Sequence, residues 1–485
     1  MTGIWTFFEG HLFAVKRRDR GVLVLETVLF LLLLSVELRE IFAHSPWRDE
    51  VQALLIARQP FPDLWRSVHY EGHPLLWFLL LKLVGWATPL ALTLAVTQAL
   101  VQAAVLALIW FRSPFSLLAR TTVCLGYFVA FEYGVLARPY GLAELGFFVF
   151  ILARRSVWAW VVLALLANTS THYALLACVC AGWLWVNGNR SWTGLAVLGL
   201  GGALWLASIW PAADMRPSAK MSSDLVGRGV EQLYYNSISI LAVAPGRWAV
   251  WQGGAGLALA LPLAVAPIAL GGLGLRARTA DWVAFLVFYA VLLAFGILAY
   301  TCFPRHLGIA AVFFIGLLWV QTEDGLPPNP SAWGWLGMMA IGGIAFLVTA
   351  AFHDFSAANA MADYARRAGV VDRPWAAVPG YLGLDLSGRL GVRTLNLQRG
   401  CWNTFQTWNY DPTRPVDDRV LAARLARFAA VPGGGYVLTD LDLPPTLAGR
   451  PVARFQGVMV GQDLRLYHVA QGRTAASPFP DCAAR

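Results

Sequence analysis

WRDEVQALLIARQPFPDLWRSVHYEGHP, residues 47–74, is a polar stretch that lies between two long apolar segments. It brings carboxylates, imidazoles and guanidinium groups close together in sequence: Asp49, Glu50, Asp63, Glu71, His69, His73, Arg48, Arg58 and Arg66. Most of the chain before residue 350 consists instead of apolar side chains and glycine. Ionisable groups are costly near lipid, so this concentration of them indicates a functional site.

The composition is that of a polytopic membrane protein. Of the 485 residues, 58% are hydrophobic and only 13% are charged, whereas soluble domains carry about a quarter charged residues. Several apolar runs reach the length of roughly 20 residues that spans a bilayer. The net charge of +9 lies largely in short basic clusters beside these runs, a pattern that sets membrane topology and does not indicate nucleic-acid binding.

The basic clusters predict the orientation of the chain, because positively charged loops stay on the cytoplasmic side. The N-terminal cluster Lys16, Arg17, Arg18 and Arg20 predicts a cytoplasmic N-terminus. No small-residue cleavage site follows the first apolar run, so we interpret that run as a retained helix. The stretch 42–88 then lies outside, with surface helices in which Asp49 caps the first and pairs with Gln52.

The segment 73–88 is short for a span and contains Lys82. If it makes no net crossing, the basic residues that follow later apolar runs are all cytoplasmic. We therefore expect a re-entrant or in-plane segment and about 11 crossings in total; the alternative is a true span here and a span divided wrongly elsewhere. The expected spans are about 21–41, 90–111, 115–132, 139–153, 156–172, 173–187, 192–211, 252–274, 281–301, 304–320 and 332–352.

Two further regions are expected outside the membrane. Residues 212–250 form a second outer loop, and residues 353–485 lack a spanning run and form a small extracytoplasmic α/β domain. Helices are expected in HDFSAANAMADYARRAG and DDRVLAARLARFAA, and strands in WAAVP, TLNL and YVLTD. Cys401 and Cys482 can form a disulfide if this domain lies outside the cytoplasm.

Arg48-Asp49-Glu50 is the first candidate for chemistry. A carboxylate half-buried at a membrane surface can act as a general base toward an acceptor hydroxyl. Asp49 is the stronger candidate and Glu50 accompanies it as a catalytic candidate. The structural alternative is that Asp49 only caps a helix.

His69, Glu71 and His73 are the candidate metal ligands. In an extended segment, alternate side chains share one side and can hold a divalent metal ion, with Asp49 completing the site. The alternative is a polar loop in which the histidines bond to backbone groups.

Three further motifs lie at expected outer helix ends: Arg138-Pro139-Tyr140, Asn168 to Tyr173 with His172, and Pro304-Arg305-His306. An arginine at a helix N-terminus can bind phosphate through its guanidinium group and the positive end of the helix. The alternative for each is a side chain that extends to the membrane interface.

Taken together, the motifs WRDE…HYEGHPLLWFLLLKL, ARPYGLAEL, THYALL and FPRHL resemble the GT-C superfamily of integral-membrane glycosyltransferases over about residues 1–352. The resemblance is to the bacterial branch that includes protein mannosyltransferases and lipid A aminoarabinose transferases. It implies that Asp49 is the catalytic base and that Arg138 and Arg305 lie near the donor phosphate. His73 would begin the helix below the active site, where family members commonly show a basic residue or a Pro-Pro pair.

The expected function is transfer of a hexosyl or pentosyl group from a polyprenyl-phosphate donor to a hydroxyl of a glycan, lipid or protein acceptor. The reaction is expected at the outer face of the bacterial cytoplasmic membrane. The expected substrate-binding residues are Arg138, Tyr140, His172, Arg305, His306, His73 and Glu71. The alternative is a transporter or flippase of lipid-linked saccharides, a class that tends to show internal repeats and helices broken at the midplane.

Overall fold

The computed structural model describes residues 20–215, 224–240, 257–411, 414–431, 433–460, 462–471 and 479–482. The chain divides into two compact units. The helical unit comprises 1–43, 98–207 and 221–351, and the mixed unit comprises 44–97, 208–220 and 352–485. The polar stretch 47–74 therefore belongs to the same unit as the C-terminal region, a grouping that differs from the division at 352/353 expected from composition.

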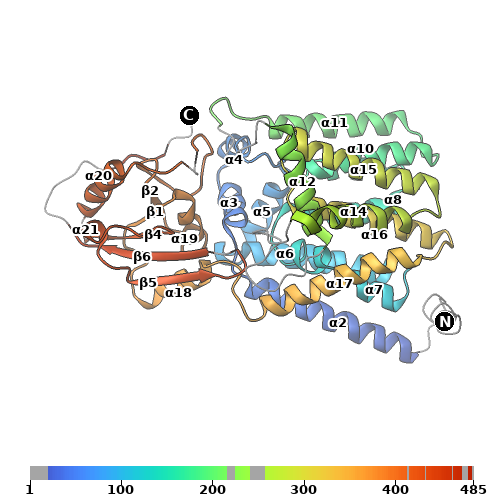
Figure 1. Ribbon diagram of the computed structural model, residues 1–485, viewed down its shortest axis with the longest axis horizontal. Helices are drawn as coiled ribbons and strands as arrows, with labels where there is room; N and C mark the ends of the chain where they lie inside the picture. Colours follow the sequence, from blue (N-terminus) through green and yellow to red (C-terminus); the bar gives the residue numbers. More distant parts are fainter. Residues whose placement is uncertain are drawn as a thin grey trace. The chain divides into compact units, whose positions relative to one another are not determined.

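The helical unit consists of apolar helices that run alongside one another (Figure 1). Among the described residues, six helices are long and apolar enough to cross a membrane, and five shorter apolar helices occur as well, one of which (Leu76–Ala87) belongs to the mixed unit. This confirms the multi-pass helical class, while the expected number of crossings stays a prediction. The helices are α2 (Arg20–Ala43), α6 (Leu90–Arg112, of which residues 90–97 belong to the mixed unit), α7 (Leu117–Cys124), η1 (Phe128–Glu132), α8 (Pro139–Ala153), α9 (Trp158–Ala167), α10 (Thr171–Val186), α11 (Trp192–Ile209), α12 (Leu225–Ile240), α14 (Leu257–Gly274), α15 (Thr279–Leu298), α16 (Pro304–Glu323) and α17 (Pro330–Ala350).

Two segments of the helical unit differ from expectation. The span expected at 115–132 is broken into α7 and the π-helical turn η1, and α17 packs directly on the break, since a Cβ at Gly343 would lie 1.9 Å from the Leu125 carbonyl oxygen. The loop expected at 212–250 contains α12, which is joined to its neighbours by polar contacts. Asn236 donates to the Ala264 carbonyl at 2.5 Å and accepts from the Tyr289 hydroxyl at 2.6 Å.

The mixed unit contains a six-stranded sheet in the order β3-β2-β1-β4-β6-β5. The β1, β2 and β4 strands are parallel, and the remaining pairings are antiparallel. This confirms the expected small α/β domain. The elements are α3 (Arg48–Ala57), α4 (Phe61–Val68), α5 (Leu76–Ala87), α18 (Ala358–Arg367), β1 (Trp375–Val378), η2 (Gly380–Leu382), α19 (Gly383–Leu390), β2 (Thr394–Asn396), β3 (Cys401–Asn403), α20 (Asp418–Ala429), β4 (Gly435–Thr439), α21 (Pro445–Ala448), β5 (Ala453–Gly457) and β6 (Gln462–Val469).

The sheet is covered on both faces, because successive side chains of a strand point in opposite directions. Trp375 and Ala377 of β1 pack in a core with α18 and α19. Ala376 and Val378 pack in a second core with α20. A strand buried on both faces is typical of a doubly wound domain.

The helix α3 of the polar stretch packs on α19 through a small apolar cluster of Val51, Leu55 and Leu384. The contact is close at Gly388, where a Cβ would lie 2.3 Å from Val51 Cγ1. The α3 helix is therefore a buried element of the mixed unit. The 12-residue α5 has a length of about 18 Å, which is well short of the roughly 30 Å bilayer core. This length agrees with a segment that does not cross the membrane, and the re-entrant placement of α5 stays a prediction.

A disulfide joins Cys401 of β3 to Cys482 near the C-terminus. The backbone supports the same connection, since the N–H of Cys482 donates to the Trp402 carbonyl at 2.9 Å. The possible pairing read from the sequence is thus present, and it fastens the C-terminal segment to the edge of the sheet.

Candidate functional site

The three sequence motifs of the helical unit begin three helices. Pro139 and Pro304 are the first residues of α8 and α16, where proline is favoured because the first helical N–H has no intrahelical acceptor. Ser170 precedes α10 and accepts from the Tyr173 N–H at 3.3 Å. Arg138, His172 and Arg305 therefore lie at or beside helix N-termini, as the sequence predicted.

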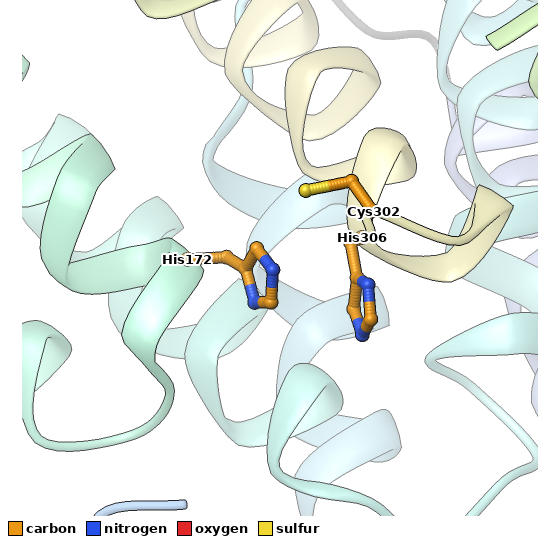
Figure 2. Close-up of side chains that lie close together, drawn as sticks. All are labelled: His172, Cys302 and His306. Carbon is orange, nitrogen blue, oxygen red and sulfur yellow. The ribbon is translucent and has the colours of Figure 1, made fainter. Parts of the chain in front are cut away.

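These helix ends meet. The His172 ring of α10 and the His306 ring of α16 stack with centroids 4.1 Å apart and planes 12° apart, and Figure 2 shows the two rings face to face. The Tyr140 ring of α8 lies 5.8 Å from His306. Helix N-termini carry partial positive charge, so their convergence favours an anionic ligand.

Two guanidinium groups add formal charge to this region. Arg138 is only 5% exposed, and its Cζ lies 5.4 Å from the Tyr140 ring centroid. The Arg305 Cζ lies 4.9 Å from the Phe303 ring, and the backbone carbonyl of Arg305 accepts from Tyr133 at 2.5 Å. The five helical-unit residues predicted from the sequence thus lie in one connected region of aromatic and cationic side chains.

The hydrogen bonding of His306 assigns its proton. The backbone N–H of Phe303 donates to Nδ1 at 3.1 Å, so the neutral ring carries its proton on Nε2. In that form Nε2 is a hydrogen-bond donor, and it suits a phosphate or another oxyanion.

His172, Cys302 and His306 form the group of potential metal ligands found in the described part of the chain, with one atom of each within 4.8 Å of the others. Two imidazoles and a thiolate suit zinc or copper(I). If Nε2 of His306 coordinated a metal ion, the ring proton would have to move from Nε2 to Nδ1. Nδ1 could then no longer accept the hydrogen bond from the Phe303 N–H, so that bond would break. The Cys302 thiol donates to the Leu292 carbonyl at 3.5 Å. Cys302 was not among the predicted site residues, although it stands four positions before His306 in the sequence.

In the mixed unit, the adjacent carboxylates Asp49 and Glu50 have different surroundings. Glu50 is 1% exposed; it accepts from the Trp47 N–H at 2.8 Å and lies 2.9 Å from His44 Nε2. Glu50 therefore caps α3, the role that the sequence assigned to Asp49 with Gln52. The Asp49 side chain is 30% exposed and lies 3.6 Å from Arg48 Nε, which leaves it accessible for proton transfer.

The expected metal group His69, Glu71 and His73 is not assembled. Residues 69–71 form a turn after α4, so alternate side chains do not share one side as they would in an extended segment. His69 Nδ1 lies 2.6 Å from the Trp210 carbonyl. Glu71 instead accepts from Gln52 at 2.7 Å, and His73 is half-buried.

A polar network around Glu71 and Asp214 joins the polar stretch to the C-terminal region. Glu71 also accepts from the Trp408 indole at 3.1 Å. Asp214 accepts from Tyr70 at 2.6 Å and from Asn409 at 3.1 Å. These bonds lower the pKa of Asp214, and burial, followed by the bond to Asp214, raises the pKa of Tyr70 to about 12.

Gln52 and Gln406 form the centre of this network. The Gln52 side chain donates to the Gln406 carbonyl at 2.7 Å and accepts from its N–H at 2.9 Å. Both residues are buried. A pairing that satisfies two buried backbone groups fixes the position of α3 relative to the sheet domain.

Comparison with known proteins finds no matching family model and no matching curated protein. Among solved structures, the chain is similar to one described as the crystal structure of ArnT from Cupriavidus metallidurans bound to undecaprenyl phosphate. The TM-score is 0.41 and the sequence identity 13%, over 95% of this chain and 100% of the other. No activity, ligand or residue role is carried from that protein to this chain on a likeness of this degree.

Proposed function

We propose that this chain is a membrane glycosyltransferase that moves a hexosyl or pentosyl group from a polyprenyl-phosphate donor to an acceptor hydroxyl. The observation that carries the proposal is the meeting of the N-termini of α8, α10 and α16 in an apolar helical unit. Side chains from their first turns, Tyr140, His172 and His306, contact one another.

A polyprenyl phosphate combines an anionic head with a hydrocarbon chain, and the helical unit offers surroundings for both. Arg138 and Arg305 supply positive charge beside the helix ends, and Nε2 of His306 supplies a donor. The surrounding helices are apolar enough to contact lipid chains. The same groups stabilise the lipid phosphate as it leaves, because negative charge develops there as the bond to the sugar breaks.

Asp49 is proposed as the general base. It takes the proton of the acceptor hydroxyl as the acceptor oxygen bonds to the anomeric carbon, and the lipid phosphate leaves with the electron pair of the broken bond. Two features support this role: the carboxylate is accessible, and its helix is held by the Gln52–Gln406 pairing. Glu50, which caps the helix, is proposed to orient Asp49 rather than to exchange protons.

The proposed location is the outer face of a bacterial cytoplasmic membrane, with the N-terminus inside and the sheet domain outside. The disulfide between Cys401 and Cys482 supports this side of the membrane, because disulfides persist in oxidising compartments.

The test uses detergent-solubilised full-length protein and a polyprenyl phosphate that carries a radiolabelled sugar, with extracted cell-envelope glycolipid as acceptor. We expect release of lipid phosphate together with transfer of label, and a fall of about 10²–10³-fold in rate for Arg305→Gln, which loses one charge-stabilising group. Arg66→Gln is the matched control, because Arg66 is exposed and pairs with Asp63 on the same helix.

Release of lipid phosphate in detergent distinguishes the transferase from a transporter, which needs a bilayer and leaves the donor intact. Movement of intact donor across liposomes, with no lipid phosphate released in either preparation, would contradict the proposal. Full activity of a folded Asp49→Asn protein would contradict the assignment of the base.

A further inference from the structure

The sheet has a topological switch point between β1 and β4. These strands are parallel neighbours, yet the chain leaves them toward opposite faces. After β1 it enters η2 and α19, which pack with one core, and after β4 it continues to Leu443 and Ala448 of the other core. In open α/β sheets, ligands bind outside the carboxyl ends of the strands at such a point.

Residues from three segments lie at these strand ends, where Val378 of β1 is paired with Thr439 of β4. Tyr381 follows β1, Asp440 follows β4, and Arg48 comes from α3. The Arg48 Cζ lies 4.6 Å from the centroid of the Tyr381 ring. Partial desolvation by neighbouring protein atoms, the largest influence, raises the pKa of Asp440, while a backbone hydrogen bond and the positive charges of Arg465 and Arg48 lower it.

Arg465 fixes the loop that follows β4. Its Nη1 donates to the Asp440 carbonyl at 2.8 Å, and its Nε lies 2.9 Å from Asp442 Oδ1. The Asp440 side chain is exposed, and Arg48, Asp49 and Tyr381 are half-buried. The switch point therefore presents two carboxylates, one guanidinium and one aromatic ring on supported backbone.

This set of groups matches the chemistry of a sugar ring. Carboxylates accept from hydroxyl groups and guanidinium donates to them, in each case with charge-assisted bonds. The Tyr381 ring lies against the Arg48 guanidinium and orients it by a cation–π contact. A phosphate would be repelled by Asp49 and Asp440, and a purely apolar ligand would leave the charged groups desolvated without partners.

We infer that the carboxyl ends of β1 and β4, together with Arg48 and Asp49 of α3, form the subsite for a sugar ring of the acceptor. Asp440 and Arg48 bond to ring hydroxyls, and the Tyr381 ring holds the Arg48 guanidinium in position. This inference rests on the proposed function, because the subsite would bring a hydroxyl of the acceptor to the base Asp49. A subsite for a sugar ring narrows the class of acceptor to a glycan or a glycosylated lipid.

The test measures binding, separately from transfer. Saturation-transfer difference NMR on the detergent-solubilised full chain uses a panel of methyl hexosides and methyl pentosides as probes. We expect at least one glycoside to bind the wild type, and Asp440→Asn and Tyr381→Ala to weaken that binding about tenfold, as expected for loss of one charge-assisted bond or of the ring contact. Tyr381→Phe, which keeps the ring, and Asp418→Asn, an exposed carboxylate of α20, are the controls that should retain binding.

Binding that persists unchanged in Asp440→Asn and Tyr381→Ala would overturn the subsite, and so would the absence of binding by every glycoside. Release of lipid phosphate from the donor is measured in parallel. A wild type that releases lipid phosphate but binds no glycoside refutes only the subsite, whereas a wild type that releases none refutes the transferase itself.

Discussion

Replacing Asp385 with asparagine should stabilise the mixed unit at alkaline pH. Asp385 lies on α19, the helix that packs on α3, and it is 1% exposed. Burial raises its pKa from 3.8 to about 7, against a smaller opposing effect of the hydrogen bond from Gln462. The folded protein therefore keeps this carboxyl protonated at pH values where the unfolded chain has released the proton.

The sign and size follow from this difference. Below pH 3.8 both states are protonated and the wild type has its full stability. Between pH 3.8 and pH 7 the folded state keeps the proton on Asp385 and the unfolded state has released it. The free energy of unfolding therefore falls as the pH rises through this range, and it stays low above pH 7. The pKa of the folded carboxyl, about 7, lies about 2 pH units above pH 5. Stability changes over these 2 units and no longer changes once the pH has passed the pKa, so pH 8.5 lies on the plateau. At about 1.4 kcal/mol per unit, the stabilisation by Asp385→Asn should grow by about 3 kcal/mol over this range.

Hydrogen exchange of α19 amides, measured by mass spectrometry on the detergent-solubilised full chain, checks this value. Wild type and variant are compared at the same pH, so that the intrinsic exchange rates cancel. Asp363→Asn is the control, because Asp363 is exposed and pairs with Arg366 on the surface. The reasoning is refuted if the gain from Asp385→Asn is equal at both pH values. It is also refuted if asparagine destabilises α19 at pH 8.5, which would mean that the arginines stabilise the ionised carboxylate by more than its burial costs.

Three other predictions concern packing, the disulfide and the helix ends. Gly388→Ala should destabilise the α3–α19 contact by about 1–3 kcal/mol through overcrowding, and Val51→Ala should restore hydrogen-exchange protection of α19 in the double variant. Replacing Cys401 and Cys482 by serine should lower the unfolding free energy of the sheet domain by about 4 kcal/mol, as expected when a cross-link closes a loop of 81 residues; an unchanged denaturant midpoint for the sheet domain would contradict this. His306→Gln should lower the rate of lipid-phosphate release more than tenfold. Cys302→Ser should change that rate by no more than about twofold, because the histidines bind an anion and not a metal ion. Equal losses of rate in the two variants would contradict this and favour a metal ion.

Much of the fold could be predicted because its signals are local. The apolar run of α2 and the short apolar runs of β1 and β4 are each visible within a few sequence positions. Pro139 and Pro304 marked the starts of α8 and α16 by the same kind of signal. The broken span at α7 and η1 was not predictable, because the close approach of Gly343 depends on a distant helix.

The candidate site could be predicted only in part, for the same reason. Arg138, His172 and Arg305 stand in motifs, whereas the partner of Gln52 is 354 residues away and has no motif of its own. The prediction of a metal group assumed an extended backbone at 69–73, whereas residues 69–71 form a turn. Likewise, Glu50 replaced Asp49 as the cap of α3 because the cap depends on the side-chain rotamer, which the residue order does not determine.

The most direct test of the central claim is the affinity of the detergent-solubilised protein for polyprenyl phosphate, measured beside its transfer rate. We predict that Arg305→Gln binds the lipid phosphate at least tenfold more weakly, as expected for loss of a charge-assisted contact, while Asp49→Asn binds it like the wild type and transfers no sugar. Equal affinity in Arg305→Gln and wild type, or undiminished transfer by Asp49→Asn, would contradict it.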